Sequence, residues 1–287
     1  MQKLDNKLSV SLNNQLLDII NYYAQRLNSL GINNAKNEII WYLEFKKLTN
    51  RYNIYLNNDL GIYKKIKNSI RYFFQLRKQH KPFQYIIKSS SFYNRDFYIN
   101  KNVLIPRPES ETFIEILKNK IYNNVLEIGT GSGVLSISLS LEMIGKNFIA
   151  TDISSQALYV AKKNIKYYNI KNIQLKKHNI LKDNIKKKFD LIISNPPYIS
   201  KQDYNVLPKH IKCYEPEIAL TDNSNGLIFY KNFAQIAKNN LNSNGIMILE
   251  IGKINSMKKI QKIFINNNFN TEFVKDQNDD YRLIIIN

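Results

Sequence analysis

The sequence is poor in the residues on which several classes of protein depend. It contains one cysteine, Cys213, in 287 residues, which excludes an internal disulfide and a metal cage of thiolates. Its three histidines are far apart and show no metal-ligand spacing. No run of about 18 apolar residues occurs, so no transmembrane helix is expected. These absences fit a protein of a reducing compartment that needs no metal.

The first residues also lack the features of a targeting segment. The stretch MQKLDNKLSVSLNNQ has no apolar signal core and few arginines, so it does not resemble a secretory or transit peptide. We therefore expect a cytoplasmic location and no contact with a membrane.

Acidic residues are few compared with basic ones, and the formal net charge is +19. Such a charge suits a polyanionic partner such as DNA or RNA. However, lysine, asparagine and isoleucine are over-used along the whole chain and glycine is scarce, with 9 residues. Codons rich in A and T produce this pattern everywhere rather than in one patch. We attribute most of the charge to compositional drift.

The pattern of apolar residues divides the chain into three parts. Residues 1–80 have apolar side chains at helical spacing and predict a small all-α domain that docks the substrate, with Trp41 in its core. Residues 81–105 contain short aromatic and β-branched runs, which predict a β-hairpin linker. Residues 106–287 alternate strands and helices, which is typical of a catalytic α/β domain.

The repeated strand–helix units predict a doubly wound, Rossmann-like sheet that is mostly parallel. Seven runs in this region have the character of strands. The last two, 271–275 and 281–286, are separated by a turn and predict an antiparallel hairpin at the end of the sheet.

A glycine-rich segment, VLEIGTGSGVLS, joins the first strand of this region to its first helix. Gly129, Gly131 and Gly133 alternate, which lets the backbone turn sharply and approach a ligand closely. The spacing is neither the dinucleotide fingerprint nor a P-loop. Asp152 follows about twenty residues later, at the tip of the second strand, where a carboxylate can accept the ribose hydroxyls of a nucleoside.

The stretch SNPPYIS ends a buried strand with an asparagine, two prolines and a tyrosine. Asn195 Oδ1 and the carbonyl of Pro196 can accept both hydrogens of a planar amino group and so aim its lone pair at an electrophile. Tyr198 can pack on the flat group and exclude water. Adenine N6, guanine N2 and the glutamine side-chain amide all fit such a turn, and the turn alone does not choose between them.

These segments together resemble the class I methyltransferases, which use S-adenosylmethionine. The resemblance implies that Glu127 lies near the methionine moiety, that Asp152 holds the ribose, and that Asn179 and Ile180 meet the adenine. Two positions depart from the usual pattern, because aspartate is more frequent at Glu127 and an acidic residue at Asn179. The implied cofactor-binding set is Glu127, Gly129, Thr130, Gly131, Ser132, Gly133, Asp152, Asn179, Ile180 and Asn195.

Further segments resemble the release factor glutamine methyltransferase family. They are NVLIPRPESE, YEPEIAL, ILEIG and PFQY, and the layout of a helical domain, a hairpin and a catalytic domain is also similar. The resemblance implies methylation of N5 of the glutamine in the Gly-Gly-Gln motif of peptide chain release factors by a monomer. The implied substrate-binding residues are Asn195, Pro196, Pro197 and Tyr198, and Asn195, Pro196 and Tyr198 are the implied catalytic residues.

The alternative is an amino-methyltransferase that acts on adenine N6 in DNA or guanine N2 in ribosomal RNA. The flanking segments favour the protein substrate, so no direct nucleic-acid substrate is expected. In the same resemblance Arg107 shapes the wall near the cofactor, unless it only forms a surface ion pair with Glu109 or Glu111. Two glycines of the family pattern are replaced, one by Lys88 and one, in the final hairpin, by Asn278, which tolerates a positive φ.

Overall fold

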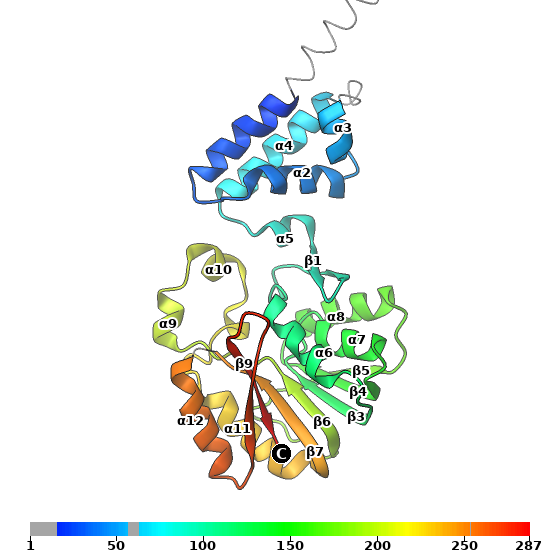
Figure 1. The fold of residues 1–287 in the computed structure, drawn as a ribbon, viewed down its shortest axis with the longest axis vertical. Helices are drawn as coiled ribbons and strands as arrows, with labels where there is room; N and C mark the ends of the chain where they lie inside the picture. Colours follow the sequence, from blue (N-terminus) through cyan, green and yellow to red (C-terminus); the bar gives the residue numbers. More distant parts are fainter. Residues whose placement is uncertain (1–15, 57–62, 253) are drawn as a thin grey trace, which may run out of the picture. The chain divides into compact units, whose positions relative to one another are not determined.

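The computed structural model describes residues 16–56, 63–252 and 254–287. The chain forms two units, Met1–Ile87 and Lys88–Asn287, each with its own hydrophobic core. The boundary assigns the short helix α5 (Phe83–Ile87) to the first unit (Figure 1). Among the described residues, no helix combines the length and the apolar character that a membrane span requires.

The first unit is helical, as its apolar spacing predicts. Helices cover residues 16–28, α2 (Ala35–Phe45), α3 (Arg51–Leu56), α4 (Tyr63–Lys78) and α5. Arg77 of α4 donates from Nε to Glu38 of α2 at 2.6 Å, and both side chains are largely buried. The expectation for Trp41 is wrong, because its side chain is 43% exposed; its ring lies beside that of Phe83.

The second unit contains the predicted seven-stranded sheet, in the order β5-β4-β3-β6-β7-β9-β8. The strands from β5 to β7 are parallel, whereas β9 pairs antiparallel with both β7 and β8, so the predicted final hairpin is confirmed. The strands are β3 (Tyr122–Ile128), β4 (Gly145–Asp152), β5 (Ile173–Lys177), β6 (Phe189–Ser194), β7 (Leu241–Glu250), β8 (Thr271–Lys275) and β9 (Tyr281–Ile286).

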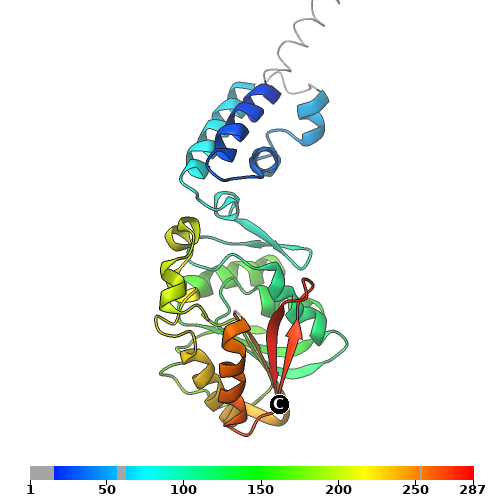
Figure 2. The same cartoon turned by 60° about the vertical axis from the view of Figure 1, so that its left-hand side comes forward.

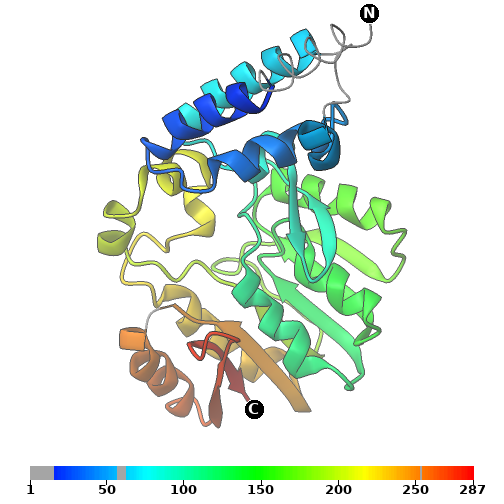
Figure 3. The same ribbon diagram turned by 45° about the horizontal axis from the view of Figure 1, so that its top comes forward.

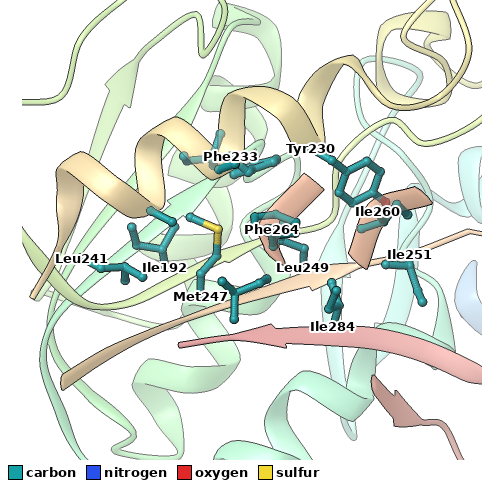
Figure 4. Packing of buried hydrophobic residues seen from close by; sticks show 14 of the residues in the cluster. Ile192, Tyr230, Phe233, Leu241, Met247, Leu249, Ile251, Ile260, Phe264 and Ile284 are labelled. Atoms are coloured by element: carbon teal, nitrogen blue, oxygen red, sulfur yellow. The ribbon is translucent and has the colours of Figure 1, made fainter. Parts of the chain in front are cut away.

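Helices cover both faces of this sheet because its strands are apolar on both sides. Val125 faces one core, with α6 (Thr112–Leu117), α7 (Val134–Leu141) and α8 (Ser155–Tyr167). The next residue, Leu126, faces the other, with α11 (Ile228–Asn240) and α12 (Ile254–Ile265). Figure 2 shows α11 and α12 together on their side of the sheet, and Figure 4 shows side chains of these helices above Met247, Leu249 and Ile284 of the strands.

The strand order reverses at β3, and this reversal creates the crevice in which doubly wound sheets bind ligands. The chain continues from β3 to β4 and β5 on one side, and returns to β6 on the other. Ile128 pairs with Ser194 across the switch point. The glycine-rich loop after β3 and the Asn-Pro-Pro-Tyr turn after β6 therefore begin side by side.

A small hairpin, β1 (Ser89–Phe92) and β2 (Arg95–Tyr98), precedes the sheet and lies along α8 (Figure 3). Asn164 of α8 connects this hairpin to the glycine-rich loop. Its Oδ1 accepts from Tyr98 N at 2.8 Å, while its Nδ2 donates to Tyr98 O at 3.0 Å and to Ser132 O at 2.8 Å. The hairpin and the loop are thus held by one buried amide.

Some local features differ from the sequence prediction. Two short helices after β6, α9 (Lys201–Asn205) and α10 (Lys209–Tyr214), were not expected. In the final hairpin the residue with positive φ is Asp279, at 66°, so the expectation for Asn278 is wrong. Lys88, which stands where the family pattern has a glycine, has a φ of 58°. Glycine adopts this conformation without the steric cost that a side chain adds.

Candidate active site

A cavity of about 530 Å³ lies at the carboxyl ends of the parallel strands. Its wall brings together segments that are up to 141 residues apart in the sequence, from Phe92 to Phe233. Of the residues that the sequence singled out, the following line it: Arg107, Gly129, Thr130, Gly131, Ser132, Asp152, Asn179, Ile180, Asn195, Pro196 and Pro197. Three predicted site residues that the structure describes are not part of this lining, namely Glu127, Gly133 and Tyr198.

The glycine-rich loop turns back over the end of β4. The amides of Gly129 and Thr130 both donate to the carbonyl of Thr151 at 2.8 Å. Gly133 has a φ of 84°, and a Cβ there would lie 3.0 Å from Ile137 Cδ1 and 3.3 Å from Ala161 Cβ. This glycine therefore allows close packing at the start of α7, and its contact with a cofactor stays a prediction.

Glu127 lies beneath the loop, with 2% of its surface exposed. Its Oε2 accepts hydrogen bonds from Thr130 Oγ1 at 2.6 Å, from the Ser136 hydroxyl, and from Ser136 N at 3.3 Å. Burial raises the pKa of this carboxyl to about 7, although the hydrogen bonds from Ser136 and Thr130 oppose the rise. In this arrangement Glu127 ties the two ends of the loop together, and its role near the methionine moiety stays a prediction.

Asp152 is at the end of β4 and faces the cavity. Its Oδ2 accepts from Gly131 N at 2.9 Å and its Oδ1 from Ser154 N at 2.8 Å. Burial raises its pKa, while these backbone amides lower it. A carboxylate offers about four acceptor positions, so positions beyond these two can accept the hydroxyls of a ribose. The cap of α8 is a different residue, Ser154, whose Oγ accepts from Ala157 N at 3.2 Å.

The segment after β5 forms the far wall of the cavity. Asn179 Oδ1 accepts from Leu181 N at 3.0 Å, and Asn179 N donates to Asp183 Oδ2 at 2.8 Å. The amide oxygen is thus already used once, which leaves one lone pair for an amino group. His178 also lines the cavity, although the sequence pattern gave it no role, and its Nε2 lies 3.2 Å from the carbonyl oxygen of Asp183.

The Asn-Pro-Pro-Tyr turn is held from behind by side chains of two other segments. Asn195 Nδ2 donates to Ser110 Oγ at 3.3 Å, and Ser110 Oγ donates to Glu250 Oε2 at 2.5 Å. The Tyr198 hydroxyl donates to Glu250 Oε1 at 3.3 Å. Sequence reasoning assigned no role to Ser110 or Glu250, although both lie in segments that carry the family resemblance, IPRPESE and ILEIG.

Tyr198 packs away from the cavity. A Cβ at Gly252 would lie 2.7 Å from Tyr198 Cδ2, so the ring lies directly on the backbone after β7. Burial is the main cause that raises the pKa of its hydroxyl, and the nearby Glu250 adds to the effect. The expectation that the ring covers the flat acceptor group stays a prediction, and the observed contacts give the ring a supporting position.

Arg107 forms an ion pair that the sequence did not indicate. Its Nη2 lies 2.7 Å from Glu215 Oε1, and Glu215 Oε2 accepts from Ile105 N at 3.3 Å. Glu215 is 6% exposed. The alternative partners, Glu109 and Glu111, are not needed to account for the position of Arg107, and the segments IPRPESE and YEPEIAL meet through this pair.

Known proteins match this chain over most of its length. The methyltransferase small domain family model matches residues 108–213. A release factor glutamine methyltransferase of Mycoplasma mycoides is 36% identical over 96% of this chain and 99% of its own length. One of Fusobacterium nucleatum is 35% identical over 94% of this chain and 78% of its own length.

The chain belongs to the release factor glutamine methyltransferase family. This enzyme is therefore an S-adenosylmethionine-dependent methyltransferase. A crystal structure of a methyltransferase from Pyrococcus furiosus has a TM-score of 0.54 at 22% identity, covers 74% of this chain and 96% of its own, and shows the same fold. The enzyme spans about half the length of longer relatives in Rickettsia that are named bifunctional methyltransferase.

The residues of the cavity fit the cofactor of this family. A glycine-rich backbone with positive φ at Gly129 and Gly131 leaves room for a ligand, because a Cβ at either position would meet nothing within 4 Å. Asp152 has acceptor positions for a ribose, and Ile180 supplies an apolar wall beside Asn179.

Proposed function

We propose that the enzyme transfers a methyl group to the side-chain amide N5 of the glutamine in the Gly-Gly-Gln motif of peptide chain release factors. The names of the two relatives support a release factor as substrate. The observation that carries the proposal is the arrangement of Asn195. Its Nδ2 is bound to Ser110, so its Oδ1 is left to accept a hydrogen from a planar amide.

We further propose that three parts of the chain have separate roles. Residues 1–80 dock the substrate, residues 81–105 form the linker, and residues 106–287 catalyse the reaction as a monomer in the cytoplasm. The helical character of the first unit and the position of the cavity within the second support this division.

The chemistry requires orientation more than acid–base catalysis. When bound, the cofactor supplies an electrophilic methyl group on a sulfonium. An amide nitrogen is a poor nucleophile because its lone pair is delocalised into the carbonyl. Asn195 Oδ1 and the carbonyl of Pro196 accept the two N–H groups, which holds the nitrogen in line and favours the localised lone pair. The proton leaves from the cationic product after transfer, so no general base has to act first.

Methyl transfer to purified substrates tests the proposal. We expect labelling of a release factor but not of duplex DNA or ribosomal RNA, and no labelling of a release factor whose motif glutamine is replaced by alanine. In the enzyme, Asn195→Ala should lower turnover about 100-fold or more, the scale of losing one key electrostatic contact, and leave cofactor binding nearly unchanged.

The matched control is Asn266→Ala, which removes an exposed asparagine and should leave turnover unchanged. Labelling of nucleic acid without labelling of the release factor would favour the alternative function and contradict the proposal. Near-normal turnover of Asn195→Ala would contradict the role of this residue alone.

A further inference from the structure

Glu250 is the last residue of β7, and its carboxylate contacts both Tyr198 of the Asn-Pro-Pro-Tyr turn and Ser110. The side chain is 1% exposed. Its two oxygens are used separately, Oε2 by the Ser110 hydroxyl at 2.5 Å and Oε1 by the Tyr198 hydroxyl at 3.3 Å. Ser110 lines the cavity, whereas Glu250 is not among the described residues that do so. Glu250 can therefore act on the reaction only through other residues.

The direction of these hydrogen bonds determines which way the Asn195 amide faces. A serine hydroxyl has one hydrogen to donate. Because Glu250 Oε2 accepts that hydrogen, Ser110 Oγ can only accept from Asn195, and it does so from Nδ2 at 3.3 Å. The amide oxygen of Asn195 must then point elsewhere. If Glu250 no longer accepted, Ser110 could donate to Asn195 Oδ1, and the amide would be free to turn over.

We propose that Glu250 is a positioning residue for methyl transfer, which fixes the orientation of the Asn195 amide through Ser110. The inference rests on the proposed function, in which Asn195 Oδ1 accepts a hydrogen from the substrate amide. It assigns the task of orientation to a chain of three segments, which contribute Ser110, Asn195 and Glu250.

The surroundings of Glu250 make its charge sensitive to pH. Arg282 of β9 and the hydroxyls of Ser110 and Tyr198 favour the carboxylate, whereas burial and Glu109 oppose it. Arg282 also pairs with Asp276 at 3.1 Å, and Arg107 acts on the same cluster through Tyr198. Burial is the largest effect and raises the pKa of Glu250 to about 7. Protonation gives Glu250 a hydrogen that it can donate to Ser110 Oγ. The Ser110 hydroxyl is then free to donate to Asn195, so the fixed orientation of the amide is lost as the pH falls.

The test compares wild-type enzyme, Glu250→Gln and Ser110→Ala between about pH 5.5 and 8.5. In the wild type we expect kcat to rise with pH through about 7. In Glu250→Gln we expect a kcat reduced about 10- to 100-fold and no inflection near pH 7, with unchanged cofactor affinity by calorimetry. Ser110→Ala should lower kcat as Glu250→Gln does, whereas Ser110→Thr keeps the hydroxyl and should have a kcat near that of the wild type. The control is Ser138→Ala, which removes a buried hydroxyl elsewhere, on α7.

Double variants separate positioning from a general loss of structure. If Glu250 acts through Asn195, Glu250→Gln should lower kcat less than about 2-fold further in an Asn195→Ala background. Additive losses, or an unchanged inflection in Glu250→Gln, would overturn the inference. If Glu250→Gln does not fold, the same comparison is made with Ser110→Ala, whose further loss of kcat in the Asn195→Ala background should also be less than about 2-fold.

The outcomes also distinguish this inference from the proposed function. If the wild type labels nucleic acid and not the release factor, the proposed function fails. The pH profile and the double variants are then measured with the labelled nucleic acid as the substrate. If the release factor is labelled and the couplings are absent, only the inference fails. An enzyme that labels neither overturns both.

Discussion

Two buried glutamates support the two loops of the candidate active site. Glu127 holds the glycine-rich loop by accepting from Thr130 and Ser136, and Glu250 holds the Asn-Pro-Pro-Tyr turn by accepting from Ser110 and Tyr198. Burial raises the pKa of both to about 7. A buried carboxylate is costly to ionise, but it fixes hydroxyl groups that would otherwise rotate. At the residue scale, these two carboxylates therefore lower the stability of the fold when they are ionised, but they fix the orientation of the hydroxyl groups that bind them.

This cost predicts a pH effect on stability at Glu127. Its pKa is raised from 4.5 to about 7, so between these values the folded state keeps a proton that the unfolded state releases. The free energy of unfolding should therefore fall as the pH rises from 4.5 to 7 and lose nothing further above 7. Glu127→Gln removes this contribution, so raising the pH should favour the variant over the wild type by on the order of 1–3 kcal/mol.

Urea unfolding at about pH 5 and pH 7.5 measures the change, with the exposed Glu272→Gln as the control for loss of a carboxylate. The quantity compared is the change in the free energy of unfolding between the two pH values. The hydrogen bonds that Glu127→Gln loses are lost at both values, so they cancel in this difference. Parallel pH dependence in the wild type and Glu127→Gln would contradict the prediction.

At the scale of elements, the turn after β6 is fixed by a second loop as well as by side chains. Asp222 closes the loop before α11, because Oδ1 accepts from Gly226 N at 2.9 Å and Oδ2 from Ile228 N at 3.0 Å. Gly226 has a φ of 78°, and a Cβ there would lie 2.5 Å from the carbonyl oxygen of Tyr198. The backbone of the Asn-Pro-Pro-Tyr turn therefore lies directly against this glycine.

We expect Gly226→Ala to impair turnover more than stability alone explains. The added methyl must displace the Tyr198 backbone, and a misplaced catalytic group can cost about 100-fold in rate. Gly31→Ala is the matched control, because Gly31 has a φ of 83° with nothing within 4 Å of the added Cβ. It should lose stability of the same order, roughly 1–2 kcal/mol, without loss of kcat. Equal kcat in Gly226→Ala and the wild type would refute the expectation.

The sequence predicted the elements better than the contacts between them. Apolar periodicity and glycine spacing are local signals, so the helical first part, the seven strands and the loop before α7 could be read directly. The chain from Asn195 through Ser110 to Glu250 joins segments 85 and 140 residues apart, and nothing local encodes such a meeting. The exposure of Trp41 was missed for a similar reason, since helical spacing does not tell how deeply a residue at the edge of a core is buried.

At the scale of the whole molecule, the positive charge is present in both units. The first 87 residues contain 14 of the 42 Lys and Arg and 5 of the 23 Asp and Glu, so neither unit is acidic. Several basic side chains are already engaged, such as Arg77 with Glu38 and Arg107 with Glu215. A charge that is spread in this way fits compositional drift and a protein substrate. The size of the salt dependence of substrate binding can separate that interpretation from binding to a polyanion.

We expect the activity on a release factor to depend only gently on salt. Screening weakens diffuse attraction between exposed charges, so KM for the release factor should rise less than about 10-fold between roughly 50 and 200 mM salt, with kcat unchanged. A nucleic-acid substrate held by six to ten phosphate contacts would instead lose about 10³- to 10⁵-fold in affinity over that range. Steady-state kinetics at constant osmolality measures both quantities, and KM for the cofactor is the internal control because its cavity is enclosed by the second unit. A steep rise confined to KM for the release factor would show a specific electrostatic docking surface and contradict drift as the origin of the charge.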